Sequence, residues 1–322
     1  MGTPPPPPDL RPLRIGEILD VAIKVYTRHA GTLFRLVLFI VAPVQLFGAI
    51  VLISTVPDAS WLNPFAGFDP ANQPTTVPET EDLYAFFAGN MLVLVLSVLA
   101  SLLATAACFH AISSAYLGAP VDWRQSLRLA ARKLHSLVWL SFISLIAITL
   151  GFIACIIPGI WLYVSFGVAV PALLTEDKRG FKAMSRSFEL VQKRWWPTAA
   201  VMVLGFFIAG LVSSLVSGVL SLLLFTDLGD SIVASAAVSA IGNTIAGVIA
   251  TPFQAAVIAI VYFDLRVRKE GFDLQLLAER IGIGPPTGPG LAPLGPAPFS
   301  YGPPSVGYPP PPPPPPSGPP PG

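Results

Sequence analysis

The sequence of 322 residues is 53% hydrophobic and only 11% charged, whereas soluble globular chains carry roughly 25% charged residues. This composition excludes an ordinary water-soluble enzyme. The 19 Lys and Arg residues nearly balance the 18 Asp and Glu residues, and the formal net charge is +1. The chain as a whole is therefore not basic, and its net charge does not indicate a nucleic-acid partner.

Proline is concentrated at the two ends of the chain. Of the 36 prolines, five form the run Pro4–Pro8 and 19 lie at or after Pro285. Such segments bury too little apolar surface to fold, and they favour the extended polyproline II conformation. We therefore predict disordered, proline-rich tails at residues 1–12 and 282–322, flanking a membrane domain at 13–281.

Five long apolar runs contain no charged residue, and they set the number of membrane crossings. Four of them hold 22, 39, 32 and 33 residues, and each suits one helix of about 20 residues across the hydrocarbon. The remaining run, 134–175, holds 42 residues and would make a rod of roughly 63 Å. It must fold back, and Pro158 and Gly159 mark the break because proline cannot continue the helical hydrogen bonds. The sequence thus predicts six spans, near 34–56, 85–113, 136–156, 160–175, 197–225 and 232–262.

The distribution of basic residues predicts the orientation of these spans. With six crossings, all 19 Lys and Arg residues fall on one side of the membrane. In the connections on the other side, all the charged residues are acidic. The positive-inside rule then predicts a multi-pass protein of a bacterial plasma membrane with both termini in the cytoplasm. The first apolar segment lacks the pattern of a cleavable signal peptide, so we expect it to stay in the protein.

Three segments on the basic side have the apolar spacing of amphipathic helices, near 15–28, 123–134 and 181–195. Each precedes two spans, so the predicted plan is one interfacial helix followed by one helical hairpin, three times. Basic residues on such helices suit the headgroup layer, where each contributes about 1 kcal/mol toward an anionic leaflet. Topological anchoring alone would need the same residues. The candidate lipid-headgroup contacts are Arg124, Arg128, Arg132, Lys182 and Arg186.

The sequence contains no pattern typical of a catalytic or metal site. Cys108 and Cys155 lie 47 positions apart inside apolar stretches, and no acidic residue shares the apolar run of His110. Nucleophile-elbow and phosphate-loop motifs are absent. A histidine hydrogen-bonded between helices is the simpler interpretation of His110, and a proton relay is the alternative. We therefore expect no enzyme activity, no cofactor and no metal.

Small residues recur every four positions in the fifth span, at Gly210, Ser214 and Gly218. Small side chains let the backbones of membrane helices approach closely. We therefore expect this face of the fifth span to pack against another helix.

Three stretches resemble a known family: LRPLRIGEILDVAIKVYTRH, PGIWLYVSFGVAVPALLTEDKRGFKAMSRSFELVQKRWW and VYFDLRVRKEGFDLQLL. The family is a bacterial six-span membrane family, here its actinobacterial branch, usually labelled as the membrane domain of glycerophosphoryl diester phosphodiesterase. The resemblance covers about Leu10 to Ile281. Its motif positions here are Pro158, Gly159, Pro171, Glu176, Asp264, Arg266, Gly271 and Asp273.

The resemblance implies a location and a fold, and a link to lipid or glycerophosphodiester metabolism. Some relatives join this domain to a phosphodiesterase barrel, a fold of about 250 residues. Only about 40 residues, rich in Pro and Gly, follow the predicted membrane domain here. We therefore expect no catalytic domain in this sequence and do not transfer the enzyme activity.

The sequence as a whole predicts an all-α, polytopic membrane helical bundle, and three functions remain open. The leading hypothesis is a non-enzymatic platform for membrane lipids or for protein partners, which include a second copy of the chain or another membrane protein. A second is a transporter or channel subunit with helices broken along its path. That path would use Pro158, Pro171, Pro252, His110 and Asn243. A third is an accessory to a separately encoded glycerophosphodiester phosphodiesterase.

The predicted topology is testable by cysteine labelling in whole cells. A single cysteine in the loop 57–84 should react with a membrane-impermeant maleimide, because this loop follows an odd number of crossings. A cysteine at position 180 should react only after the cells are permeabilised. The reverse pattern would contradict the assigned orientation.

Overall fold

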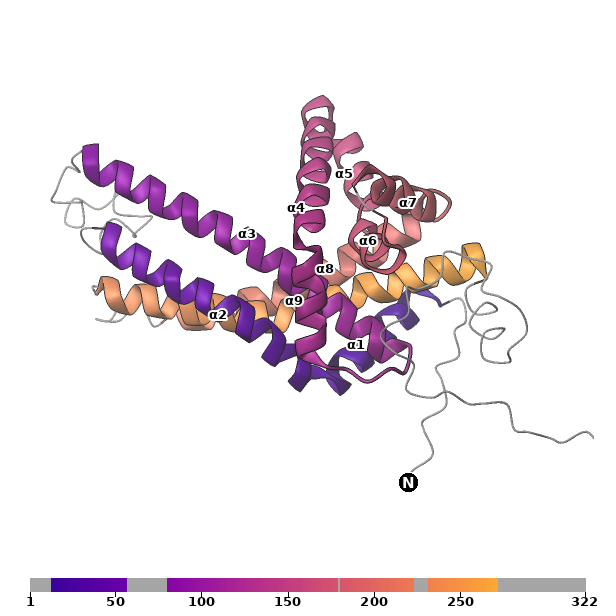
Figure 1. The fold of residues 1–322 in the computed structure, drawn as a ribbon, viewed down its shortest axis with the longest axis horizontal. Helices are drawn as coiled ribbons and strands as arrows, with labels where there is room; N and C mark the ends of the chain where they lie inside the picture. The colour runs from indigo at the N-terminus through magenta and orange to yellow at the C-terminus, as the bar shows by residue number, and fades with distance from the viewer. Residues whose placement is uncertain (1–12, 57–79, 179, 223–230, 272–322) are drawn as a thin grey trace, which may run out of the picture.

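The computed structural model describes residues 13–56, 80–178, 180–222 and 231–271, and within these ranges all regular structure is helical. Asp273 and the predicted tails at 1–12 and 282–322 lie outside the described residues. The helices follow one another in chain order (Figure 1). They are α1 (Ile15–Arg28), α2 (Ala30–Thr55), α3 (Thr80–Tyr116), α4 (Trp123–Ala154), α5 (Ile156–Ser165), α6 (Ala169–Glu176), α7 (Phe181–Gln192), α8 (Trp195–Ser221) and α9 (Ile232–Glu270).

Six segments of the described chain are long and apolar enough to cross a membrane, as the sequence predicts. Five of them contain α2, α3, α4, α8 and α9, and the fourth in chain order joins α5 and α6. Large apolar side chains cover their outer faces: Phe39 is 61% exposed, Leu145 63% and Leu215 67%. So much apolar surface would be unfavourable in water, whereas it suits contact with lipid tails. The all-α polytopic bundle is therefore confirmed.

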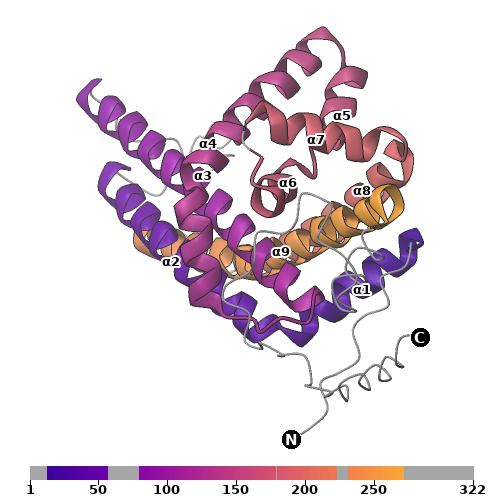
Figure 2. The same ribbon diagram turned by 45° about the vertical axis from the view of Figure 1, so that its right-hand side comes forward.

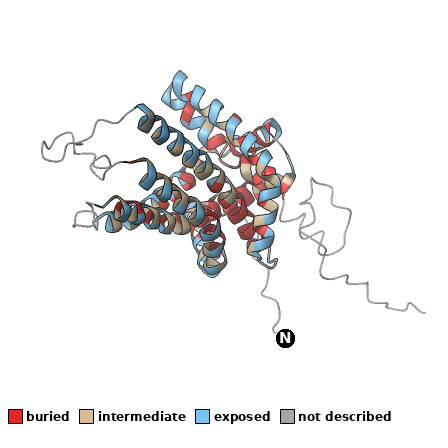
Figure 3. Cartoon of the chain, turned by 60° about the vertical axis from the view of Figure 1, so that its left-hand side comes forward, coloured by how far each residue is buried: buried red, intermediate tan, exposed pale blue. Residues whose placement is uncertain are grey.

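The second half of α9 forms the core of this bundle. Nearly every residue from Phe253 to Val267 is buried, and Tyr262 and Phe263 have no exposed surface. Helices α1, α2, α3, α6, α7 and α8 all contact α9. Figure 3 shows buried residues concentrated where these helices meet, and exposed residues toward the far ends of the spans. A stretch of helix that is apolar on most of its faces needs this central position, and its buried charges, Asp264 and Arg266, need partners there.

Two groups of helices extend from this core. Helices α2 and α3 pack side by side, and α8 packs along α9 (Figure 1). The hairpin of α4 and α5 diverges from the α2–α3 pair in both ribbon views (Figure 2). Helices α6 and α7 fill the space between that hairpin and the end of α9, with contacts to both.

The expected fold-back within 134–175 occurs at a single residue. Cys155, in extended conformation with φ −175° and ψ 158°, separates α4 from α5. Pro158 lies in the first turn of α5, where its missing N–H costs no helical hydrogen bond. The α4 and α5 backbones approach closely here, because a Cβ added to Gly151 would lie 3.1 Å from the Cα of Gly159.

The same run has a second break, within the predicted span 160–175, where only the transporter hypothesis placed a broken helix. It lies at 166–168, between α5 and α6. Pro171 again occupies the first turn of the helix that follows. The freed carbonyl of Ser165 accepts a 2.7 Å hydrogen bond from the Ser187 hydroxyl of α7, which is fully buried. The break therefore leaves this carbonyl satisfied inside the protein, as membrane depth requires.

Two of the three predicted interfacial helices are separate helices. Helix α1 covers 15–28 and α7 covers Phe181–Gln192, and each ends just before a span begins. The segment 123–134 is instead the first part of α4 and continues into the third span without a break. The side chain of Asp122 caps α4 by accepting the Arg124 N–H at 2.9 Å.

The glycine stripe of the fifth span does not pack as expected. A Cβ added to Gly210 or Gly218 would meet no heavy atom within 4 Å, and both residues are exposed. The close approach lies one turn earlier, where a Cβ on the buried Gly205 would come within 2.9 Å of the Val257 side chain of α9. The spacing identified small residues, but it did not identify the face that contacts α9.

Gly205→Ala and Gly210→Ala form a matched pair on α8. We expect Gly205→Ala to destabilise the protein by about 1–3 kcal/mol, because the added methyl group overpacks the α8–α9 contact. Gly210→Ala should be neutral or stabilising by up to about 1 kcal/mol, because alanine favours the helix and meets open space. Thermal unfolding of the detergent-solubilised variants measures both effects. Equal melting temperatures for the pair would contradict the α8–α9 packing.

Candidate functional site

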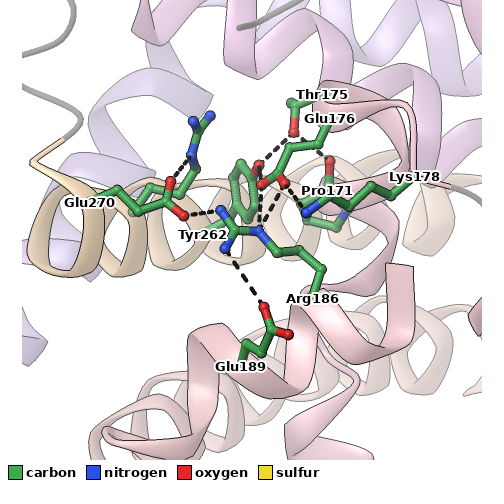
Figure 4. Close-up of polar contacts among 9 residues, drawn as sticks. Pro171, Thr175, Glu176, Lys178, Arg186, Glu189, Tyr262 and Glu270 are labelled. Carbon is green, nitrogen blue, oxygen red and sulfur yellow. Dashed lines mark hydrogen bonds and ion pairs between the residues drawn. The ribbon is translucent and has the colours of Figure 1, made fainter. Parts of the chain in front are cut away.

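Seven residues from the end of α6, the turn after it, the middle of α7 and the last turns of α9 form a largely buried group of ion pairs and hydrogen bonds, termed here the ionic cluster (Figure 4). They come from two of the stretches that carry the motif resemblance. The members are Thr175, Glu176, Lys178, Arg186, Tyr262, Arg266 and Glu270.

Glu176, the last residue of α6, lies at the centre of the ionic cluster. Its side chain has no exposed surface. The Arg186 Nε donates to both carboxylate oxygens, at 3.0 and 2.8 Å, and the Tyr262 hydroxyl donates to Oε1 at 2.9 Å. The Lys178 ammonium lies 3.1 Å from Oε2. The buried negative charge is therefore compensated by two cations and a hydroxyl.

Arg186 links this carboxylate to the end of α9. Its terminal Nη2 donates to Oε1 of Glu270, whose Oε2 in turn accepts from the Arg266 Nε at 3.1 Å. Burial alone would lower the pKa of the Arg186 guanidinium, but hydrogen bonds to Glu270 and Glu176 outweigh it and raise that pKa above its ordinary value. Arg186 thus stays charged, and charges alternate in sign from α6 through α7 to α9.

The turn between α6 and α7 brings Glu176 and Arg186 together. Asp177 ends α6 in the left-handed conformation with φ 51°, and Gly180 also has a positive φ of 55°. These two conformations reverse the chain direction. Lys133 of α4 secures the turn, since its ammonium lies 3.0 Å from Oδ1 of Asp177 and donates to the Leu174 carbonyl at 3.3 Å.

A second contact, termed here the Leu13 clamp, ties the start of the described chain to α9. Asp264 accepts the Leu13 N–H at 2.8 Å. Arg268 donates through Nε to both Asp264 oxygens, at 3.0 and 2.9 Å, and through Nη2 to the Leu13 carbonyl at 2.5 Å. Both backbone groups of Leu13 are therefore held by one helix that lies about 250 residues further along the chain.

The contacts of the ionic cluster join α6, α7 and α9. Each carboxylate in it accepts from a basic side chain, and its tyrosine hydroxyl bridges Glu176 and Thr175, which lies 2.6 Å away. Within the described ranges no group of three or more His, Cys, Asp and Glu side chains could hold a metal ion. The cluster therefore connects helices through paired charges.

The five candidate headgroup contacts differ in their surroundings. Arg124, Arg128 and Arg132 are exposed along one face of α4, and the Arg124 guanidinium lies 5.2 Å from the centroid of the Trp123 ring. Lys182 is exposed on α7. Arg186, by contrast, is engaged with Glu176 and Glu270, with only 12% of its side chain exposed. The lipid contacts of these residues stay predictions. For Arg186, the partners in the structure are the carboxylates of Glu176 and Glu270.

The family-motif positions occupy structural points of the fold. Glu176 and Arg266 belong to the ionic cluster, and Asp264 forms the Leu13 clamp. Pro158 and Gly159 lie in the first turns of α5, and Gly271 ends α9 in the left-handed conformation with φ 59°. The carbonyl of Pro171 accepts from the Thr175 hydroxyl at 2.8 Å.

Sequence reasoning missed several partners in these contacts. Glu270 and Arg268 each lie four residues after their partner on α9, Arg266 and Asp264, and this helical spacing is a signal that could have found them. Tyr262 lies inside an apolar run, and no spacing along the chain relates its hydroxyl to Glu176, which lies 86 residues earlier.

His110 lies inside the protein, hydrogen-bonded to a neighbouring helix. Its Nδ1 is 3.1 Å from the hydroxyl of Ser126 on α4, and this hydroxyl also donates to the Asp122 carbonyl at 2.9 Å. Asn243 is exposed on α9. The contact with Ser126 agrees with a histidine hydrogen-bonded between helices.

No protein-family model, curated protein or solved structure matches this chain. The family resemblance therefore rests on its motif residues, and the function has to be argued from the structure.

Arg186→Gln tests the ionic cluster. We expect a loss of about 3–5 kcal/mol in stability, because Glu176 would keep a buried charge without its main partner. Lys182→Gln on the same helix removes an exposed charge and should change stability by less than about 0.5 kcal/mol. Adding Glu176→Gln to Arg186→Gln should recover part of the loss. Thermal unfolding in detergent gives these values, and equal effects of Arg186→Gln and Lys182→Gln would refute the role of the cluster.

Proposed function

We propose that the protein is a non-enzymatic integral membrane protein of a bacterial plasma membrane, whose basic side faces the cytoplasm and binds anionic lipids. The observation that carries this proposal is a division among the basic residues. One group is paired inside the protein, including Lys133, Lys178, Arg186, Arg266 and Arg268. The other group is exposed and has no carboxylate within 4.0 Å among the described residues. It includes Arg28, Arg35, Arg124, Arg128, Arg132 and Lys182.

The exposed group lies where lipid headgroups would meet the protein. Arg124, Arg128 and Arg132 step by four residues along the first three turns of α4, just before that helix enters its apolar part. Trp123 beside them is an amphipathic ring of the kind enriched at the membrane interface. Each such cation contributes about 1 kcal/mol toward an anionic leaflet. Paired cations hold the fold, and exposed cations are available to lipids.

The cytoplasmic orientation is supported by the same charges. Every described Lys and Arg lies on α1, at the start of α2 or α4, around α7, or at the end of α9. In the connections on the opposite side, all the charged residues are acidic. Retention of basic residues on the cytoplasmic side accounts for this asymmetry.

Two functions of other classes remain as alternatives. A transporter is favoured by the broken fourth span, beside which lies a small cavity of about 190 Å³ lined in part by Ser141, Ser144 and Tyr163. Solute-dependent flux into liposomes, with glycerophosphodiesters among the solutes, would support it. An accessory role follows from the family resemblance alone, and co-purification with a phosphodiesterase would support that role.

Replacing the three α4 arginines tests lipid binding. We expect Arg124→Gln/Arg128→Gln/Arg132→Gln to weaken phosphatidylglycerol binding on the order of 100-fold, because three cations of about 1 kcal/mol each are lost. The matched triple lysine variant keeps the charges and should retain most of the binding. Native mass spectrometry of the detergent-extracted protein, titrated with phosphatidylglycerol, measures retention. Equal retention by the glutamine variant and the unaltered protein would remove the lipid-binding part of the proposal.

A further inference from the structure

A cavity of about 550 Å³ opens between the start of α1, the start of α8 and the last turns of α9. Three arginines line it, Arg14, Arg194 and Arg268. They come from segments far apart in the sequence, so only the fold brings them together. The rest of the wall is mainly apolar, with Leu13, Ile15, Ile18, Val201, Val261 and Leu265 among its residues.

The cavity carries an excess of positive charge. Asp264 also lines it, and pairs with Arg268 in the Leu13 clamp. Neither Arg14 nor Arg194 has a carboxylate within 4.0 Å of its guanidinium among the described residues. Three guanidinium groups against one carboxylate leave a net formal charge of about +2 facing this space.

The start of α8 adds to this field. Arg14 and Arg194 are the N-cap residues of α1 and α8. The Glu17 carboxylate accepts the Arg14 N–H at 2.8 Å, whereas α8 has no side-chain cap. Residues of both first turns, among them Gly16 and Thr198, line the cavity. A helix N-terminus carries partial positive charge and free N–H groups, so the uncapped start of α8 reinforces the attraction of the arginines for an anion.

The position of the cavity, between basic residues and the apolar part of the bundle, indicates which kind of anion would fit it. Val201 and Val261 belong to the fifth and sixth spans, so one wall continues into the apolar part of the bundle. Arg194 directly precedes the fifth span, and Arg14 directly precedes α1, which is not a span. A free inorganic anion would leave this apolar wall uncovered. A phospholipid offers both parts, because its phosphate is anionic and the glycerol and first acyl carbons are apolar.

We propose that this cavity binds the headgroup of an anionic phospholipid, with the phosphate among Arg14, Arg194 and Arg268 and the glycerol and first acyl carbons against Val201, Val261 and Leu265. The inference rests on the proposed function, in which the basic side meets anionic lipid. It goes further by assigning a specific site, distinct from the exposed face of α4. The volume falls within the range of roughly 300–1,000 Å³ typical of ligand pockets.

Arg14→Gln/Arg194→Gln tests the site in the full-length protein. Arg268 is left unchanged because it also holds Leu13. The control is Lys24→Gln, which removes an exposed charge of α1 that is already paired with Asp20 at 2.6 Å and lies outside the cavity. Titration with phosphatidylglycerol in detergent, followed by native mass spectrometry, should show roughly 30-fold weaker binding for the cavity variant. The control should change binding by less than about threefold, and phosphatidylcholine should not compete.

Further measurements separate the outcomes. Arg14→Lys/Arg194→Lys should restore most of the affinity, and the lipid-free melting temperature shows that each variant is folded. Equal weakening by the cavity and control variants would overturn the specific site while leaving the proposed lipid binding intact. Loss of phosphatidylglycerol binding only in the α4 triple variant would also overturn the site. Competition by inorganic phosphate or a soluble glycerophosphodiester at the same concentration as the lipid would overturn the phospholipid as occupant.

Discussion

A charge inside a low-dielectric protein or beside hydrocarbon must be paired or excluded, and this constraint organises the whole structure. Exclusion accounts for the long uncharged runs, which confine every described Lys and Arg to the segments between or beside the apolar parts of the spans. Pairing accounts for the charges that remain inside. Glu176 is fully buried only because Arg186, Lys178 and Tyr262 surround its carboxylate.

The number of spans and the fold class were predictable because they depend on local composition. An apolar run of sufficient length crosses the bilayer whichever helices surround it. The break at 166–168 was not part of the predicted span 160–175, because membrane helices tolerate proline without a break, whereas Pro171 lies in the first turn of a new helix, α6. Pro158 occupies the corresponding place in α5. Pro43 and Pro252, in contrast, lie inside continuous helices, so proline alone does not distinguish a start from an interior position.

The candidate sites could be predicted only in part, because sequence spacing shows which residues share a helix face and not what that face meets. The pairing of Asp264 with Arg268 follows from a separation of four residues. The pairing of Arg186 with Glu270 joins residues 84 positions apart and depends on how α7 lies against α9. The same limit explains why the α8 contact uses Gly205 and leaves Gly210 exposed.

The Leu13 clamp has a consequence for the order of assembly. A ribosome delivers the chain from its N-terminus, and Leu13 therefore emerges about 250 residues before the Asp264 and Arg268 that hold it. During synthesis Leu13 therefore lacks its contacts with Asp264 and Arg268 while the spans between them are inserted one after another. Docking of α1 onto α9 can therefore only follow the synthesis of α9.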